Sequence, residues 1–240
     1  MNLRKAYQSG ALFLVLFLCT ESIFAQQSKF DLFLGGGIHI PKMDDINNIY
    51  LNRQDLKDYH KIRFTYDLSG GFMYRFVSNF SVKLGFNYLF HIQHPPVELI
   101  SDDGETAEGK INYKIKAYCP FLGIDYHHSI SPDYRFGFGF NLVRCMARLI
   151  DEVPNAAVIF SSLHGNSWGF VIASNIRRRL VNHVDIGLEF GYRFLEVNKV
   201  KVDSQYYEEF SEDVQYTING RTLDLDFSGP FIRLLIISNL

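Results

Sequence analysis

Residues 62–92 alternate between apolar and polar positions with a period of two. From Ile62 to Phe76 every second residue is apolar or glycine, and the residues between them, apart from Met73, are charged, polar or small. The alternation restarts after the short stretch 77–79 and continues from Phe80 to Ile92. A period of two over about a dozen residues is typical of a β-strand with one apolar face, and two such strands joined by a tight turn form a hairpin.

The same alternation recurs along the chain and predicts eight strands. One face of each strand is aromatic or aliphatic, and the other carries charged residues and glycine. Several are longer than the ~5–6 residues usual for a strand in a soluble protein. We expect these strands at residues 30–40, 62–76, 80–92, 111–126, 134–142, 168–176, 184–194 and 222–240.

The strand at 111–126 contains a change of phase. Ile111, Tyr113 and Ile115 continue one apolar face, but the apolar face near the other end begins at Leu122 and is out of phase with them. Pro120 lies between the two halves. A proline is tolerated at a β-bulge, and one extra residue would shift the phase, so we predict a bulge at Pro120.

The predicted connections alternate between long and short. Residues 41–61, 93–110, 150–165 and 198–221 are long and polar, whereas 77–79, 127–133 and 177–182 are short. Short periplasmic turns and long external loops are typical of bacterial outer-membrane barrels, and a closed barrel satisfies its backbone hydrogen bonds in lipid. The sequence therefore predicts an all-β fold, an eight-stranded antiparallel up-and-down transmembrane β-barrel with periplasmic termini. The alternative is a soluble lipocalin-like barrel, whose apolar face points inward.

The first 25 residues have the features of a secretory signal peptide. Arg4 and Lys5 precede the apolar run 11–18, and Ala25 is the small residue before the expected cut. That run is shorter than the ~20 residues of a membrane helix. The bulky Leu18 argues against lipidation of Cys19, which follows it. We expect a signal peptide over 1–25, one barrel domain over 26–240, and a location in the bacterial outer membrane after cleavage near Ala25.

Charge and cysteine content exclude several functions. The formal net charge is −2, which gives no indication of nucleic-acid binding, and aromatic residues make up 15% of the chain. Folding the chain about a turn near residue 130 places Cys119 opposite about residue 142, so Cys145 is expected out of register with it. We therefore predict two isolated thiols instead of a disulfide, and neither has metal-site spacing. No cofactor or metal is expected.

The mature chain resembles the eight-stranded outer-membrane β-barrel family of Gram-negative envelopes. The resemblance rests on the signal peptide, the hairpin layout, and the stretches 117–126 and 225–231. The segment around Pro120 is similar to that of PorT-like barrels, some of which serve protein secretion. The resemblance implies a structural or interaction role, accessory to secretion or envelope integrity. One departure is the ending Ser238-Asn239-Leu240, where many such barrels end on an aromatic residue.

The inward face of the predicted strands carries charges of both signs. The lumen of an eight-stranded barrel is only wide enough to be filled by side chains, and buried charges must be paired. We therefore predict a self-neutralising network, with glycines making room for it; the alternative is a narrow small-solute channel or proton path. The expected members are Arg63, Asp67, Arg75, Lys83, Asp125, Arg135, Asp185, Glu189 and Arg193.

One short stretch raises the alternative of an enzyme. His127-His128-Ser129 resembles the His-x-Ser pattern of outer-membrane lipid A deacylases, in which a serine needs a nearby base. It falls in a predicted periplasmic turn, whereas those enzymes work from the outer leaflet. Residues 161–164, Ser-Ser-Leu-His, are interpreted as ordinary loop. We expect no catalytic site and no enzymatic activity.

The long loops are the predicted binding surface. The barrel wall contacts lipid, and loops on a rigid scaffold are where binding residues concentrate. The segment 198–221 carries aromatic residues among acidic ones, and exposed aromatic residues are frequent interface anchors. We predict a monomeric barrel that meets a protein partner chiefly through 41–61 and 198–221. The alternative is that the aromatic residues pack together and extend the sheet. They are Tyr206, Tyr207, Phe210 and Tyr216.

Overall fold

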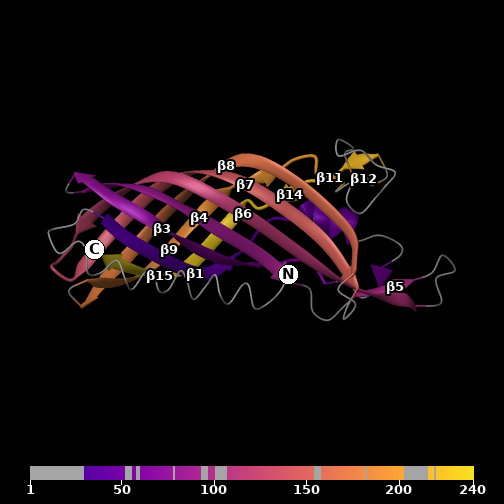
Figure 1. Cartoon of the computed structure of the whole chain (residues 1–240), viewed down its shortest axis with the longest axis horizontal. Helices are drawn as coiled ribbons and strands as arrows, with labels where there is room; N and C mark the ends of the chain where they lie inside the picture. Colours follow the sequence, from indigo (N-terminus) through magenta and orange to yellow (C-terminus); the bar gives the residue numbers. More distant parts are fainter. Residues whose placement is uncertain are drawn as a thin grey trace.

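The barrel wall is a closed ring of eight antiparallel strands (Figure 1). The computed structural model describes residues 30–51, 56–57, 60–77, 79–92, 97–100, 107–153, 158–181, 183–202, 216–218 and 220–240, so the predicted signal peptide lies outside the described residues. The wall strands are β1 (Phe30–His39), β3 (Thr65–Val77), β4 (Phe80–Ile92), β6 (Ala107–Ser129), β7 (Tyr134–Val153), β8 (Val158–Val181), β9 (Val184–Phe194) and β15 (Gly229–Asn239). Each pairs with the next, and β15 pairs with β1. The predicted up-and-down barrel is confirmed.

The outer wall at mid-height is apolar, because alternate side chains along each strand point away from the lumen. On β9, Leu188 and Phe190 are each 47% exposed, whereas Glu189 between them is 1% exposed. Phe72 on β3 and Phe138 on β7 are exposed in the same way. This is the band that a membrane barrel presents to lipid, and it is the reverse of a soluble barrel. Within the described residues, no helix is long and apolar enough to cross a membrane.

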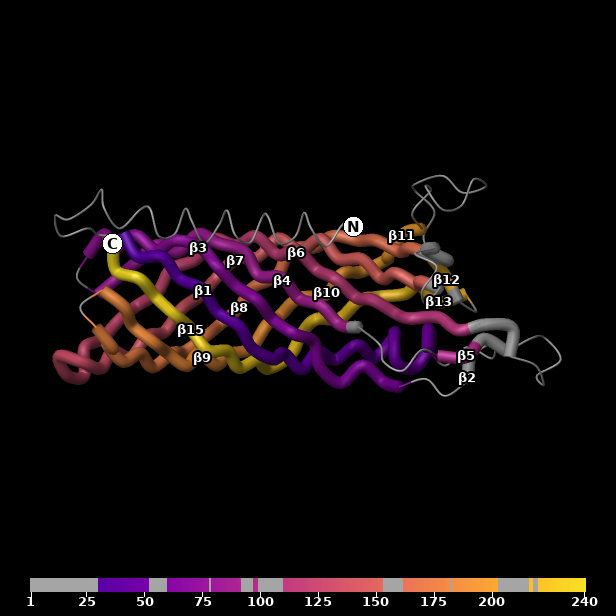
Figure 2. Tube along the Cα trace, turned by 60° about the horizontal axis from the view of Figure 1, so that its bottom comes forward, coloured from indigo at the N-terminus to yellow at the C-terminus, as the bar shows by residue number. Residues whose placement is uncertain are grey.

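The two ends of the barrel differ (Figure 2). The terminal end is the end where β1 begins and β15 finishes; the loop end is the opposite one. At the loop end β6, β7 and β8 extend to 23, 20 and 24 residues, so much of the predicted loops 93–110 and 150–165 continues the sheet. Short elements add to it: β2 (Leu56–Lys57), β5 (Val97–Ile100), β10 (Glu196–Val197), β11 (Lys201–Val202), β12 (Thr217–Ile218), β13 (Arg221–Thr222), β14 (Leu225–Asp226) and the π-helical turn η2 (Ile46–Tyr50).

The predicted bulge at Pro120 is wrong. The pairing of β6 with β4 runs from Phe80 to Ile92 without a shift, and its pairing with β7 has the same register on both sides of the proline. Pro120 is exposed on the outer face, opposite Phe86 of β4. The strand therefore keeps one phase along its whole length.

The apparent change of phase comes from the lumen, whose polarity changes along the barrel. Ile111, Tyr113 and Ile115 were predicted to face outward, but they are buried inside the loop end of the barrel. Asp125, on the same face of β6, is buried near the terminal end. An apolar side chain marks the lipid face only where the interior is polar, so the sequence pattern misplaces this half of the strand.

The two cysteines face each other, contrary to the predicted register. Their strands turn at 130–133, two residues later than expected, because Ser129 pairs with Arg135. The register on either side of Pro120 then places Cys119 of β6 opposite Cys145 of β7. Both are free thiols and fully buried.

Candidate functional site

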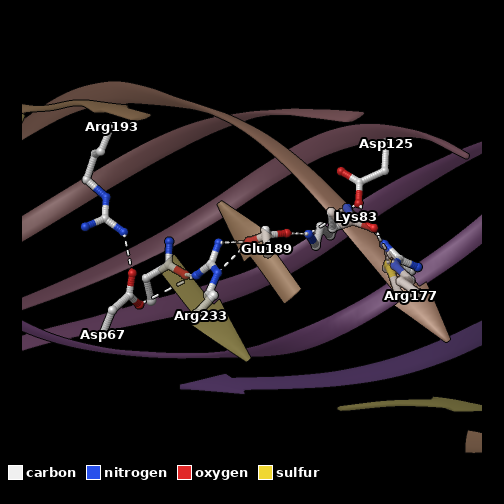
Figure 3. A network of polar contacts seen from close by, with 10 residues as sticks. Asp67, Lys83, Asp125, Arg177, Glu189, Arg193 and Arg233 are labelled. Carbon is white, nitrogen blue, oxygen red and sulfur yellow. Dashed lines mark hydrogen bonds and ion pairs between the residues drawn. The ribbon is translucent and has the colours of Figure 1, made fainter. Parts of the chain in front are cut away.

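The lumen near the middle of the barrel contains a continuous chain of ion pairs (Figure 3). Asp67 of β3 lies between two arginines: its carboxylate is 2.9 Å from Nη2 of Arg193 and 3.6 Å from Nη1 of Arg233. Arg233 of β15 also pairs with Glu189 of β9 and donates a 2.9 Å hydrogen bond to Asn87. All of these side chains are buried. Two guanidinium groups thus share two carboxylates across the lumen.

The chain continues toward the terminal end through Lys83. Its Nζ atom lies 3.5 Å from Glu189 and 3.3 Å from Asp125. Arg177 of β8 lies 3.5 Å from the same Asp125 carboxylate and donates a 2.7 Å hydrogen bond to Asn175. We call Asp67, Lys83, Asp125, Arg177, Glu189, Arg193 and Arg233 the lumen charge network. With four basic and three acidic members it is nearly neutral, and it joins strands on all sides of the barrel.

Glycines on the inward faces leave the space that the charged side chains occupy. A Cβ atom on Gly139 of β7 would lie 2.1 Å from Oδ1 of Asp125. A Cβ atom on Gly187 of β9 would lie 3.1 Å from Cγ of Arg177. The alternation of charge and glycine in these strands is therefore a packing requirement, since any larger side chain would displace an ion-pair partner.

Three residues expected in the network lie nearer the terminal end. Arg75 pairs with Asp31 at 3.1 Å, and Asp185 lies between Arg135 at 3.7 Å and Arg179 at 3.9 Å. The arginine side chains here are 24–37% exposed, so water reaches these pairs.

Arg63 departs from the expectation, because β3 begins only at Thr65. It lies before the strand, where the alternation no longer applies, and its side chain is exposed. Ile62 and Phe64 were predicted on one outward face; Phe64 is exposed as predicted, but Ile62 is buried.

Sequence reasoning missed two members of the network. Arg177 was expected in a short basic turn, but β8 continues to Val181 and turns this residue inward. Arg233 lies in β15, whose two faces are both largely apolar, so alternation alone does not separate them. The available signal was that Arg233 is a charged residue within an otherwise apolar strand, which indicates an inward position beside an acid.

The loop end of the lumen is filled by apolar side chains from residues 43–51, which we call the apolar plug. Met43, Ile46, Tyr50 and Leu51 are at most 1% exposed. They pack in one cluster with inward residues of the wall, among them Ile111 and Leu149, and with Val197 and Phe227. The apolar side chains in the first half of the predicted loop 41–61 are therefore interior, and they close the mouth above the lumen charge network, whereas Lys42, Asp44 and Asn48 remain exposed.

Polar contacts hold the apolar plug in place. Tyr50 donates a 2.5 Å hydrogen bond to the buried carboxylate of Asp151 on β7. The Asn47 side chain both donates to the carbonyl of Ile62 at 3.1 Å and accepts from its amide at 2.7 Å. The backbone amide of Met43 donates to the carbonyl of Asp226. The plug is thus tied to the wall, to the segment before β3 and to β14.

One of the four aromatic residues predicted as loop contacts is described, and it packs on the plug. Tyr216 is half-buried, and its ring centroid lies 6.1 Å from that of Tyr50. Its amide donates to Val200 and its carbonyl accepts from Leu223. Tyr216 therefore supports the closed mouth. Tyr206, Tyr207 and Phe210 lie outside the described residues.

The two candidate catalytic stretches lie on wall strands, not in loops. His127 points into the lumen near the terminal end of β6, and Ser129 is exposed at the rim, where the strand ends. Ser162, which is buried, and His164, which is partly exposed, lie on β8 near the loop end and pair with Ile150 and Arg148 of β7. Among the described residues no group of three potential metal ligands is present.

Acidic residues gather at the loop end beside β10 and β14. Glu196 lies opposite Asp226, and Asp45 accepts a 3.2 Å hydrogen bond from the amide of Asp224. Partial burial, and then the carboxylates of Asp226 and Asp224, raise the pKa of Glu196 above its usual range. Lys42 lies 4.0 Å from Asp226 and offsets part of this negative charge.

We expect neither cysteine to react with a maleimide in the folded barrel, because Cys119 and Cys145 are both 0% exposed inside the wall. The mass of the protein should rise by two adducts only after denaturation. A Ser129→Cys variant supplies the control, since residue 129 is exposed and its thiol should react without denaturation. Labelling of the native cysteines at the rate of that control would contradict the closed lumen.

The chain is similar in fold to solved outer-membrane barrels. The outer membrane protein OprG of Pseudomonas aeruginosa matches it with a TM-score of 0.51 and 13% identity over 89% of this chain and 96% of that one. Neisserial surface protein A matches with a TM-score of 0.48 and 10% identity over 89% of this chain and 98% of that one. No protein-family model and no curated protein matches the sequence.

The closed ring, the apolar outer wall and the match to OprG define the fold as that of an eight-stranded outer-membrane β-barrel. At these identities the likeness establishes a shared architecture. The function has to be argued from the chain's own residues.

Proposed function

We propose that the protein is a closed, non-catalytic barrel of the bacterial outer membrane that binds a protein partner at its loop end. The observation that carries this proposal is the filled lumen. The lumen charge network occupies the middle of the barrel, and the apolar plug occupies the loop end. The short turns and both termini face the periplasm in this arrangement, and the signal peptide 1–25 is removed near Ala25.

A small-solute channel is the less favoured alternative. Asp67 and Arg193 are 0% exposed, and the plug residues Met43 and Leu51 are equally buried. A conducting pathway needs a continuous wet path, and both layers would have to open. In planar bilayers the purified protein should therefore show no conductance steps.

An enzyme is also less favoured. Ser129 lies at the terminal rim, away from the leaflet where a lipid A deacylase would act, and His127 is partly buried with its Nδ1 atom inside the lumen. Replacing either residue by alanine should leave the lipid A of the cell unchanged by mass spectrometry.

The proposed partner site is the part of 198–221 that carries Tyr206, Tyr207 and Phe210. The plug takes the apolar side chains of residues 43–51 away from the surface, which favours the second segment as the binding site at the loop end. The specific form that the PorT-like resemblance suggests is an accessory role in protein secretion or envelope integrity.

We expect deletion of residues 204–214 to abolish partner binding while the barrel still assembles. Crosslinking in whole cells, followed by identification of the adducts, measures partner binding, and heat-modifiability on gels measures assembly. A matched control is deletion of 102–105 in another long connection, which should leave the partner adduct intact.

A second pair of variants separates recognition from packing. The triple replacement of Tyr206, Tyr207 and Phe210 by alanine should lose the adduct without loss of stability. Tyr216→Ala should instead destabilise the barrel, since that ring packs on Tyr50. The proposal is wrong if the deletion prevents assembly or leaves the partner adduct in place.

A further inference from the structure

Three arginines and two aspartates face the inside of the barrel at its terminal end. Arg75 of β3, Arg135 of β7 and Arg179 of β8 alternate with residues of the outer face, so their side chains point toward the lumen. These side chains are 33%, 24% and 37% exposed, whereas those of Asp31 and Asp185 are 6% and 3% exposed. We call these five residues the terminal cluster. Its arginines are thus accessible to solvent at the terminal end, and its acids lie behind them.

Basic residues outnumber acidic ones in the terminal cluster and the lumen charge network together. The network has four basic and three acidic members and the cluster has three and two, which gives seven basic residues against five acidic ones. Arg135 lies directly opposite Arg177 on the neighbouring strand, and the charges of Arg75 and Arg179 also act on it. Like charges directly opposite on neighbouring strands are destabilising. An anion held among these arginines would lower that repulsion.

The other negative groups at the terminal rim do not pair with these arginines. Asp133 is exposed in the turn between β6 and β7, and the amide of Leu240 donates to the carbonyl of Phe30, which places the carboxyl terminus beside β1. Among the described residues, the ion pairs of the three cluster arginines are all with Asp31 and Asp185. The excess of positive charge therefore remains at the terminal end.

The polar atoms of the terminal cluster are only partly hydrogen-bonded. Nη1 of Arg135 and Nε of Arg179 lie 3.7 and 3.9 Å from Asp185, and both distances are too long for a hydrogen bond. Nε of Arg179 is buried and has no hydrogen-bond partner among the described residues, and the same holds for Oδ1 of Asp31 and Oδ1 of Asp185. The cluster thus offers donors near its opening and acceptors deeper inside.

We propose that the terminal cluster binds the phosphate group of a small hydroxyl-bearing phosphate ester of the glycerol phosphate class. Guanidinium groups bind phosphate through paired hydrogen bonds. A phosphate ester is favoured over a carboxylate because its three terminal oxygens can accept from arginines on three strands. Its hydroxyl groups would donate to the free carboxylate oxygens of Asp31 and Asp185.

The same glycerol phosphate group occurs in soluble esters and in the headgroup of phosphatidylglycerol. A soluble ester of the periplasm is favoured because the cluster arginines face the lumen and not the lipid side of the wall. The proposal uses the orientation given above, with the terminal end in the periplasm, and is independent of the protein partner at the loop end.

Isothermal titration calorimetry of the purified mature barrel in detergent tests this proposal, with glycerol phosphate as the probe. Salt at about 0.15 M screens diffuse attraction between exposed charges, so saturable binding reports a site. We expect glycerol phosphate to bind several-fold more tightly than propyl phosphate, which lacks the hydroxyl groups. Arg135→Gln and Arg179→Gln should each weaken binding about ten- to a hundredfold, because a hydrogen bond to a charged group is lost. Each variant leaves Asp185 paired with the other arginine, so the barrel should still assemble.

Arg178→Gln is the matched control. Arg178 is next to Arg179 on β8, but it is exposed on the outer face, where its guanidinium lies over the ring of Tyr134. This variant removes the same charge at the same end and should bind as the natural sequence does. Heat-modifiability on gels shows that each variant has assembled. The proposal is overturned if glycerol phosphate does not saturate the barrel, if propyl phosphate binds equally well, or if Arg178→Gln loses as much affinity as Arg179→Gln.

Nanodiscs of two compositions distinguish the two sources of the group. Glycerol phosphate should bind equally well in discs of phosphatidylcholine and in discs that contain phosphatidylglycerol. Loss of binding only in the discs with phosphatidylglycerol would overturn the assignment to a soluble ester and identify the lipid headgroup as the ligand of the same arginines.

Discussion

Replacing Asp67 by alanine is expected to lower the free energy of unfolding by about 3–5 kcal/mol, because it leaves buried arginines without their counter-charge. Arg193 is 0% exposed and pairs with Asp67 at 2.9 Å, and Arg233 shares the same carboxylate at 3.6 Å. Solvent cannot replace the lost partner at this depth. Urea titration of the barrel refolded in lipid vesicles, followed by the gel-mobility shift between folded and unfolded forms, measures the change.

The control for this prediction is an ion pair of the same charge type on the surface. Glu98 lies 3.6 Å from Lys110, and both side chains are more than a third exposed. Glu98→Ala should cost no more than about 1 kcal/mol, as is usual for exposed pairs. Equal costs for the two variants would mean that water fills the lumen and screens Asp67.

A double variant tests whether the cost of losing Asp67 comes from the unpaired charge of Arg193. Removing Arg193 together with the acid, as Asp67→Leu/Arg193→Met, takes away one positive and one negative charge. This double variant should be more stable than Asp67→Ala, since replacing both members of a buried pair by apolar groups is far less costly than breaking it. The contrast shows whether the penalty comes from an unpaired charge or from lost packing.

The wall of the barrel could be predicted from the sequence because alternation has a physical cause at mid-height. There lipid lies on one side and charge on the other, so Leu188 and Glu189 must face opposite ways. The same contrast identified Asp67, Lys83, Asp125 and Arg193 as inward residues. The alternation of apolar and polar residues therefore depends on what surrounds the strand, lipid outside and charge inside, and not on the strand conformation alone.

The loop end could not be predicted in this way because its interior is apolar. Tyr113 and Ile115 face the plug, and Lys114 and Lys116 face outward, so the polarity of the two faces is reversed relative to mid-height. The alternation within one strand does not show which of its faces points inward when the interior is apolar. That orientation depends on residues 43–51 entering the mouth of the barrel, which is a contact between segments far apart in the chain.

Leu188→Arg at mid-height of β9 is expected to destabilise the barrel by about 2–4 kcal/mol in lipid vesicles, because it places a charge in the hydrocarbon layer. Leu180→Arg is the matched control: Leu180 is 57% exposed on the outer face of β8, one residue before the strand ends at the terminal rim. The cost there should be about 0–1 kcal/mol, since the charge reaches the interface. The two exposed fractions, 47% and 57%, are similar, so solvent accessibility alone predicts equal effects. Unfolding free energies that differ as stated identify lipid as the surrounding medium, and equal values would show that the apolar wall does not face a membrane.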